Sequence, residues 1–441
     1  MKRLLLIALL ATGLAPFAAP QSKPAPVVGA VPSPDASIEV RQRSFDVVWR
    51  TVKEKHFDPT FGGVDWDKVR AQYEPQVAAV KSDAELYAIL QKMLGELHQS
   101  HFNIIPPEAI VEDDAKEPPT GGVGISLSIV DGLALITRVE PESAAARAGI
   151  RSGFVVRKVD QTPVEEIAAR FAKSTERPAM IRLRLARTIL ARINGKPGTA
   201  VRVAFADERN RTQEVTLERQ RLNGEMSPRF GNFPAQYTEF EAKRLAGGIG
   251  YIRFNIFVMP LMERIRSAIR SMKDAPGIIF DIRGNPGGLG GMSSGIAGLL
   301  AREQTSLGRM TLRSGYQNFA VFPQKDPYTG PLVILIEGGS ASTSEVFSAG
   351  MQEIGRAVIV GERSVGAALP SVFEKLPTGA LFQYAIADFR TPKGTLIEGR
   401  GVIPDLEVKL SRETLLRGRD IQLDAAIRQI KRSGFNIERT H

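Results

Sequence analysis

A serine-rich turn at residues 338–344 has the residue types that nucleophilic catalysis requires. An apolar strand is predicted over 333–336 before the turn, and a helix is predicted to begin near Glu345 after it. Glycine and alanine let a substrate backbone approach a serine hydroxyl, and a helix start offers free N–H groups to an oxyanion. The G-x-S-x-G pattern of nucleophile elbows is absent, and a serine-rich N-cap of a buried helix explains the same residues. Both interpretations remain open on these residues alone.

Composition limits the classes to which the chain can belong. Its 441 residues are 43% hydrophobic and 24% charged, which is ordinary for a globular protein of two or three domains. The chain has no cysteine, which excludes disulfides, thiol catalysis and Cys-ligated zinc. The formal net charge is +10, but no basic run is interleaved with aromatic residues, so we expect no nucleic-acid partner.

The N-terminus has the pattern of a signal peptide. Lys2 and Arg3 precede an apolar run over 4–14, and small residues follow it. We predict a signal peptide over 1–21 and a Pro-, Ala- and Ser-rich flexible leader over 22–36, with an uncleaved anchor as the alternative. No later stretch approaches the roughly 20 apolar residues of a membrane helix. The mature chain is therefore expected to be exported, periplasmic or extracellular, with no integral membrane segment.

The remaining sequence divides into three regions by its hydrophobic period. Residues 37–118 have helical spacing, 119–220 change to short alternating strands, and 221–441 alternate strands with helices. Within the second region, residues 164–195 are predicted to be helical. In the third, strands are predicted at 249–254, 277–281 and 358–361, with helices at 260–273, 288–302 and 344–354.

Five motifs in order resemble those of the tail-specific, or C-terminal-processing, serine peptidases, a family that includes the tricorn protease. The motifs are an N-terminal segment from Phe57-Asp58-Pro59 to Trp66, Asp281-Ile282-Arg283-Gly284-Asn285-Pro286-Gly287-Gly288, the 340–345 turn, Val360-Gly361-Glu362-Arg363, and Gly401-Val402-Ile403-Pro404-Asp405. Residues 121–219 resemble the family's PDZ domain. The resemblance implies an α/β multi-domain protein with a helical N-terminal domain, a PDZ-like β-rich domain and a crotonase-like catalytic core. It also implies polypeptide substrates, without a cofactor or metal. It leaves the oligomeric state open.

The resemblance assigns roles within the turn and the glycine loop. In the family's Ser-x-Ser-x-Ser-Glu turn the middle serine attacks, which implies that Ser342 is the nucleophile. The N–H of Thr343 and a glycine N–H from Gly287 or Gly288 are expected to form the oxyanion hole, because a glycine amide can approach the substrate without a side chain between them.

The position of the family's usual general base differs in this chain. Many members use a Ser–Lys dyad with the lysine 25 residues after the nucleophile, and Ala367 stands there. The tricorn branch uses Ser, His and Glu instead, with a Ser-His pair just before the PDZ domain and a glutamate three residues ahead of the Gly-Val-x-Pro-Asp motif. His101 and Glu398 match these positions. The resemblance therefore implies that His101 is the base and Glu398 orients it.

Two alternatives to this triad remain. The chain could be a catalytically silent pseudoprotease that acts as a peptide-binding module, or an engineered form in which alanine replaced the lysine. Of the other histidines, His56 is expected to be structural, while His98 could be a decoy or a second partner of the site.

The PDZ-like region predicts a second site. The stretch Gly122, Val123, Gly124 and Ile125 resembles the PDZ carboxylate-binding loop, so backbone N–H groups there are expected to capture a substrate's C-terminus. Ile125 and Leu127 are expected to line the pocket for its last side chain. The usual Gly-Asp turn reads Gly153-Phe154, and packing against the core is the alternative role.

Overall fold

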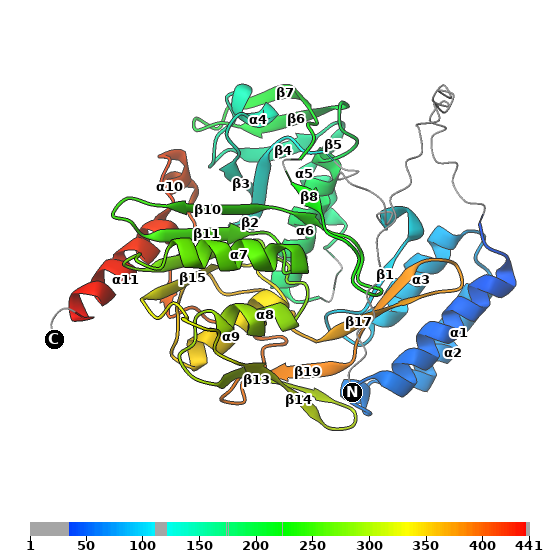
Figure 1. Ribbon diagram of the computed structural model, residues 1–441. Helices are drawn as coiled ribbons and strands as arrows, with labels where there is room; N and C mark the ends of the chain where they lie inside the picture. Colours follow the sequence, from blue (N-terminus) through cyan, green and yellow to red (C-terminus); the bar gives the residue numbers. More distant parts are fainter. Residues whose placement is uncertain (1–34, 111–120, 173, 175, 223, 438–441) are drawn as a thin grey trace, which may run out of the picture. The chain divides into compact units, whose positions relative to one another are not determined.

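The computed structural model describes residues 35–110, 121–172, 174, 176–222 and 224–437 (Figure 1). The predicted signal peptide at 1–21 and nearly all of the leader at 22–36 lie outside the described residues, so their prediction stands untested. Within the described ranges, no helix combines the length and the apolar character needed to cross a membrane.

Three helices and a short strand form the N-terminal region. Each helix begins at a capping side chain, since Ser37, Asp65 and Ser82 each accept a hydrogen bond from a first-turn N–H. The core of this region also contains Leu369, Phe382 and other residues far along the chain. The elements are α1 (Ile38–Lys55), α2 (Trp66–Ala78), α3 (Asp83–Gly95), β1 (Asn103–Ile105) and the 3-10 turns η1 (Phe61–Gly63) and η2 (Pro107–Ala109).

The PDZ-like region is a sheet of order β2-β3-β4-β6-β7, with β5 paired to β4 and β2 at one edge. The helical stretch predicted over 164–195 contains two helices. Pro178 lacks an N–H and fits only the first turn of a helix, so a new helix starts at this residue. The elements are β2 (Ile125–Val130), β3 (Leu133–Val139), α4 (Ala144–Arg147), β4 (Val155–Val159), β5 (Thr162–Pro163), α5 (Val164–Ala169), α6 (Pro178–Ile193), β6 (Ala200–Ala206) and β7 (Thr212–Glu218).

The third region is built on a sheet of order β10-β11-β12-β15-β16-β20, parallel except for the β10–β11 pair. Short β8 (Glu225–Met226) and β9 (Tyr237–Thr238) pair with each other before it. The elements are β10 (Phe240–Arg244), β11 (Gly250–Phe254), α7 (Met259–Ser271), β12 (Ile278–Asp281), α8 (Gly291–Gly298), β15 (Leu332–Ile336), α9 (Thr343–Glu353), β16 (Val358–Gly361), β20 (Leu406–Glu407), α10 (Arg412–Leu416) and α11 (Ile421–Ile437). Strands and helices alternate as predicted, although α8 is shorter than the predicted helix at 288–302.

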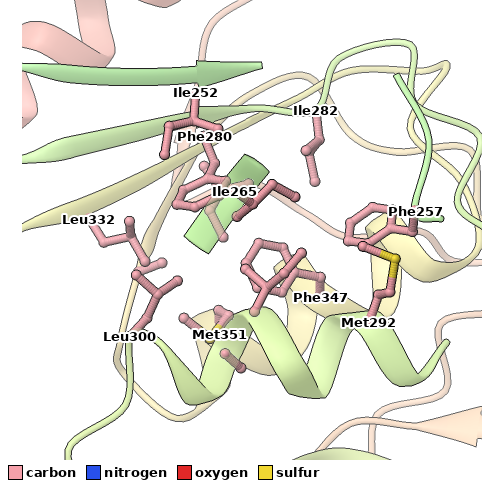
Figure 2. Packing of buried hydrophobic residues seen from close by; sticks show 14 of the residues in the cluster. Ile252, Phe257, Ile265, Phe280, Ile282, Met292, Leu300, Leu332, Phe347 and Met351 are labelled. Atoms are coloured by element: carbon pink, nitrogen blue, oxygen red, sulfur yellow. The ribbon is translucent and has the colours of Figure 1, made fainter. Parts of the chain in front are cut away.

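Both faces of this sheet are buried. Phe280 points into a large cluster with residues of α7, α8 and α9, including Phe347 (Figure 2). Ile334 belongs to the same cluster. Their neighbours Ile279 and Val333 point the other way, into a cluster with residues of α11. Alternate residues of a strand face opposite sides of a sheet, so a continuous apolar strand needs cover on both faces. This packing gives the turn at 337–342 a rigid base.

Two small sheets complete the fold, and the sequence patterns did not predict them. One has the order β14-β13-β19, and the other has the order β1-β18-β17, in which β18 pairs with β1 of the N-terminal region. Their strands are β13 (Thr305–Leu312), β14 (Tyr316–Val321), β17 (Ser371–Lys375), β18 (Leu381–Ala385) and β19 (Ala387–Arg390). The fold class expected from the sequence, a helical N-terminal region, a PDZ-like β-rich region and an α/β core, is confirmed.

Candidate active site

Ser342 occupies the turn between β15 and α9, where it is the N-cap of the helix. Its φ of 54° lies in the left-handed region, which is uncommon for a residue with a side chain. The flanking serines are fully buried, and their hydroxyls donate to backbone carbonyls, Ser340 to Ile282 and Ser344 to Asn285, each at 2.9 Å. Ser342 is partly exposed. Of the three serines, it is the one whose hydroxyl is not held by the backbone of the glycine loop.

The buried carboxylate of Glu345 holds this turn against the segment 364–367. Glu345 accepts hydrogen bonds from the N–H groups of Ser342 at 3.1 Å, Gly366 at 2.8 Å and Ala367 at 2.8 Å, and from the Ser364 hydroxyl. Burial raises the pKa of Glu345 to about 7, against the lowering effect of these donors. This role of Glu345 was not predicted, although a glutamate three residues after a capping serine is a recognisable signal.

The imidazole of His101 reaches the nucleophile turn. Its Nε2 lies 3.2 Å from Ser342 Oγ, and its Nδ1 lies 2.7 Å from Ser100 Oγ. The Ser100 hydroxyl donates its single proton to Glu398 Oε2 at 2.9 Å. Ser100 must therefore accept from Nδ1–H, which leaves the Nε2 lone pair free to accept from Ser342. The hydrogen-bond inventory thus assigns the tautomer that a general base needs.

Glu398 does not bind His101 directly, because Ser100 stands between them. Besides the Ser100 hydroxyl, the carboxylate accepts from the N–H of Ser100 at 3.1 Å and from that of Ala368 at 2.9 Å. Arg177 Nη2 lies 3.4 Å from Oε1, the oxygen that also accepts from the Ser100 N–H. Ser100 was part of the motif that pointed to His101, but its own place in the chain of hydrogen bonds was not predicted.

The environment of His101 favours the neutral ring. Burial, followed by the positive charge of Arg187, lowers the pKa of His101 to about 4. The backbone of His101 also has a positive φ, 62°. Because its pKa is about 4, the His101 ring is uncharged at neutral pH, as a proton acceptor must be.

The glycine loop lies beside Ser342. A Cβ at Gly287 would lie 2.7 Å from Thr343 N, and one at Gly288 would lie 2.3 Å from the Phe257 carbonyl oxygen, so both positions require glycine. The Gly287 N–H donates to Asn285 Oδ1 at 2.9 Å. Within the described part of the chain, the N–H groups of Gly288 and Thr343 have no such partner. These two amides are the ones free to bind an oxyanion.

The position of the family's lysine is closed. Ala367 is 6% exposed and forms an apolar cluster with Ala341 and Val365. Ala179, Met180 and Leu183 of α6 pack against this cluster. The nearest later lysine, Lys375, lies at the end of β17.

A groove runs between β2 and α6 of the PDZ-like region. It belongs to a cavity of about 980 Å³ that is lined by Ile125, Leu127 and also core residues such as Glu337. The N–H of Gly122 donates to the Gln220 carbonyl at 2.9 Å, so this amide is not free for a ligand. Val123 is buried in the PDZ-like core, and Gly124 is partly exposed beside it.

Two other histidines, His56 and His98, are among the described residues, and no hydrogen bond links either of them to Ser342, Ser100 or Glu398. His56 is buried, stacks on Phe57 and Phe102, and has its Nε2 2.9 Å from Gln99 Oε1. His98 is exposed. Among the described residues, no group of three or more His, Cys, Asp or Glu side chains is arranged to hold a metal ion.

Comparisons with known proteins point to one family. Residues 248–408 match Peptidase family S41, residues 39–95 match the Tricorn protease C1 domain, and residues 113–185 match the PDZ domain. The chain is 26% identical over 390 residues to a carboxyl-terminal-processing protease of Synechocystis sp., which covers 86% of this chain and 84% of that protein.

Solved structures show the same fold. The photosystem II D1 C-terminal processing protease aligns with a TM-score of 0.57 at 23% identity, over 86% of this chain and 98% of that one. Mature CPAF aligns with a TM-score of 0.62 at 16% identity, over 90% and 99%. This chain is thus a serine-type peptidase with a family S41 peptidase domain over residues 248–408, preceded by a PDZ domain and by a helical region that matches the tricorn C1 domain.

Proposed function

We propose that this protein is an extracytoplasmic serine endopeptidase that cleaves unfolded or tail-exposed polypeptides, with Ser342 as nucleophile, His101 as base and Glu398 as the carboxylate that orients it. The 3.2 Å approach of His101 Nε2 to Ser342 Oγ carries the proposal. The similarity to carboxyl-terminal-processing proteases supports the substrate class.

In the first step, Ser342 Oγ attacks the scissile carbonyl carbon while its proton passes to His101 Nε2. The charge that develops on the carbonyl oxygen is stabilised by the N–H groups of Thr343 and Gly288. The imidazolium is stabilised by Ser100, which accepts from Nδ1–H and donates to Glu398. Glu398 therefore acts through a hydroxyl rather than by direct contact.

In the second step, His101 returns the proton to the leaving amine, and the C–N bond breaks to leave an ester on Ser342. Water then attacks this ester while His101 accepts its proton. His101 returns that proton to Ser342 Oγ as the acyl–oxygen bond breaks, and the new C-terminal carboxylic acid leaves. Every proton in this cycle passes through one imidazole, so no lysine is required at position 367.

The test is cleavage of casein and of unstructured peptides by the purified mature chain and its variants. Ser342→Ala and His101→Ala are each expected to lower kcat by at least about 10³-fold. His98→Ala is the matched control and should keep wild-type activity, because this imidazole is exposed. Retained activity in His101→Ala would remove His101 as the base.

A peptide-binding module without turnover is the second candidate, because the groove between β2 and α6 exists whether or not the serine reacts. We propose that a substrate C-terminus enters this groove near Gly124 and Ile125 and pairs with the edge strand β2. A wild-type chain that binds peptides in fluorescence anisotropy but cleaves none of them would favour this candidate.

Export is part of the proposal and rests on the basic start and apolar run of residues 2–14. Expression of the full chain in a bacterial host, followed by fractionation and N-terminal sequencing, tests it. We expect a mature chain outside the cytoplasm that begins after residues 18–22. A cytoplasmic chain that keeps Met1 would contradict export and leave the proposed chemistry untouched.

A further inference from the structure

An arginine of the PDZ-like region enters the catalytic hydrogen-bond network. Arg177 is the residue immediately before α6, and its Nη2 lies 3.4 Å from Glu398 Oε1. The same nitrogen donates to the Gly366 carbonyl at 2.7 Å, and Nη1 donates to the Val365 carbonyl at 3.4 Å. In the described part of the chain, no other cation lies within ion-pairing distance of Glu398.

The backbone around Arg177 is held in place on both sides. Pro178 follows it and restricts Arg177 to the extended conformation, with φ −60° and ψ 143°. One turn into the helix, Ala179, Met180 and Leu183 pack on Ala341, Val365 and Ala367, beside the nucleophile. The side chain therefore leaves a helix end that is already anchored to the catalytic core.

Gly366 makes room for the guanidinium. A Cβ on this residue would lie 2.9 Å from Arg177 Nη1, and the φ of Gly366 is +75°. The neighbouring N–H groups of Gly366 and Ala367 donate to Glu345, which also binds the N–H of Ser342. Segment 365–367 is thus held from two directions: Arg177 binds carbonyl groups of the segment, and Glu345 binds its amide groups.

We propose that Arg177 is a positioning residue for catalysis, which holds the Glu398 carboxylate toward Ser100 and clamps segment 365–367 behind Ser342. The inference rests on the proposed roles of Glu398 and His101 and adds a group from a different region of the chain. It makes the PDZ-like region a structural part of the active site.

Glu398 needs Arg177 because its carboxylate is largely removed from water. Its side chain is 12% exposed, and a carboxylate removed from water needs a compensating charge as well as hydrogen bonds. Without Arg177, Glu398 keeps only neutral donors, and the Val365 and Gly366 carbonyls lose their charged partner. Ser100 then loses its fixed acceptor, and the His101 tautomer is no longer imposed.

The experiment compares the wild-type chain with Arg177→Met, Arg177→Lys and the control Arg192→Met. Arg192 is also on α6 but hydrogen-bonds Thr162, away from the core. Arg177→Met is expected to lower kcat about 10- to 100-fold with KM within about twofold. Arg177→Lys should recover part of kcat, because an ammonium restores the charge without the fork of donors. Arg192→Met should match the wild type.

Hydrogen exchange gives a second measurement that does not need turnover. In Arg177→Met the amides of Gly366, Ala367 and Ala368 are expected to exchange about 10-fold faster or more, and in Arg192→Met they should not change. Wild-type kcat in Arg177→Met would overturn the positioning role while the proposed peptidase function stands. If the wild type cleaves nothing, the peptidase proposal fails, and unchanged exchange in Arg177→Met then overturns the clamp as well.

Discussion

At the scale of single residues, the candidate site depends on two strained backbones that face each other. Ser342 and His101 have φ values of 54° and 62°. Such conformations cost about 1–3 kcal/mol each and persist only where the surroundings impose them. Glu345 imposes the first through the N–H of Ser342. Strain at both partners of the 3.2 Å contact is consistent with a site shaped for reaction rather than for stability.

The low pKa of His101 predicts that its ring remains a proton acceptor at mildly acidic pH. Because its pKa of about 4 lies below the usual 6.5, the ring stays neutral as the pH falls from 7 and protonates only near 4. The acid limb of kcat/KM that reports His101 is therefore expected near pH 4. Arg187→Gln removes a charge that opposes the imidazolium and should move this limb to higher pH.

A pH series of kcat/KM from 3.5 to 8 measures this limb, with circular dichroism as the control for folding. Protonation of Glu345, whose pKa burial raises to about 7, is expected to add a second acid limb to kcat/KM near pH 7. Both limbs are fitted, and only the lower one should move in Arg187→Gln. An identical lower limb in Arg187→Gln and the wild type would contradict the electrostatic argument.

Ser100 offers a separate test of the indirect link to Glu398. Ser100→Ala leaves Nδ1–H of His101 without its acceptor and is expected to lower kcat about 10- to 10³-fold, with KM little changed. Ser100→Thr keeps the hydroxyl and should retain most of the activity. Steady-state kinetics on one peptide measure kcat and KM for both variants. A wild-type kcat in Ser100→Ala would show that the link from His101 through Ser100 to Glu398 is dispensable.

At the scale of elements, the segment 364–368 lies between the nucleophile turn and α6. Its amides bind Glu345 and Glu398, and its apolar side chains pack under Ala179, Met180 and Leu183. The space that a lysine side chain would need is therefore filled by the PDZ-like helix. The proposed base, His101, comes instead from the segment after α3.

This packing predicts the result of restoring the family's lysine. Ala367→Lys is expected to destabilise the fold by about 2–4 kcal/mol, because an ammonium and its chain would enter a closed apolar cluster. In a His101→Ala background it should not restore cleavage. Lys375→Ala, at an exposed position, is the control and should change stability by less than about 0.5 kcal/mol. Chemical denaturation and casein cleavage measure both effects, and a rescued double variant would refute the argument.

At the scale of the whole molecule, the N-terminal helices and the C-terminal part of the chain share one core. β1 pairs with β18, and Phe382 of β18 is fully buried among residues of α1, α2 and α3. His101 lies two residues before β1. The strand pair therefore holds His101 near Ser342, which is 241 residues away in the sequence.

The shared core predicts that stability and activity are lost together. Phe382→Ala is expected to cost about 3–5 kcal/mol and to release the base from Ser342, with loss of cleavage in the same thermal transition. Tyr316→Ala is the control, because this ring is 66% exposed and its loss should cost less than about 0.5 kcal/mol. Thermal unfolding by circular dichroism, with activity measured along the ramp, tests this. Full activity after the N-terminal helices have unfolded would contradict it.

The sequence alone determined the local chemistry. The strand, small-residue turn and helix around Ser342 predicted an exposed hydroxyl, and the alanine at position 367 excluded the lysine base that the resemblance to the family implies for many members. The alternation of strands and helices after residue 247 predicted the α/β core. These features follow from residues that are neighbours in the chain, whose period and turn types carry the information.

Tertiary structure alone decided which groups meet. Ser100 contacts Glu398 across 298 positions, and Arg177 contacts it across 221. The strands at 371–385 were not predicted, and they complete the core of a region that begins at residue 38. Contacts of this kind leave no periodic trace, because they depend on how separately formed elements pack and on which buried charges then need partners.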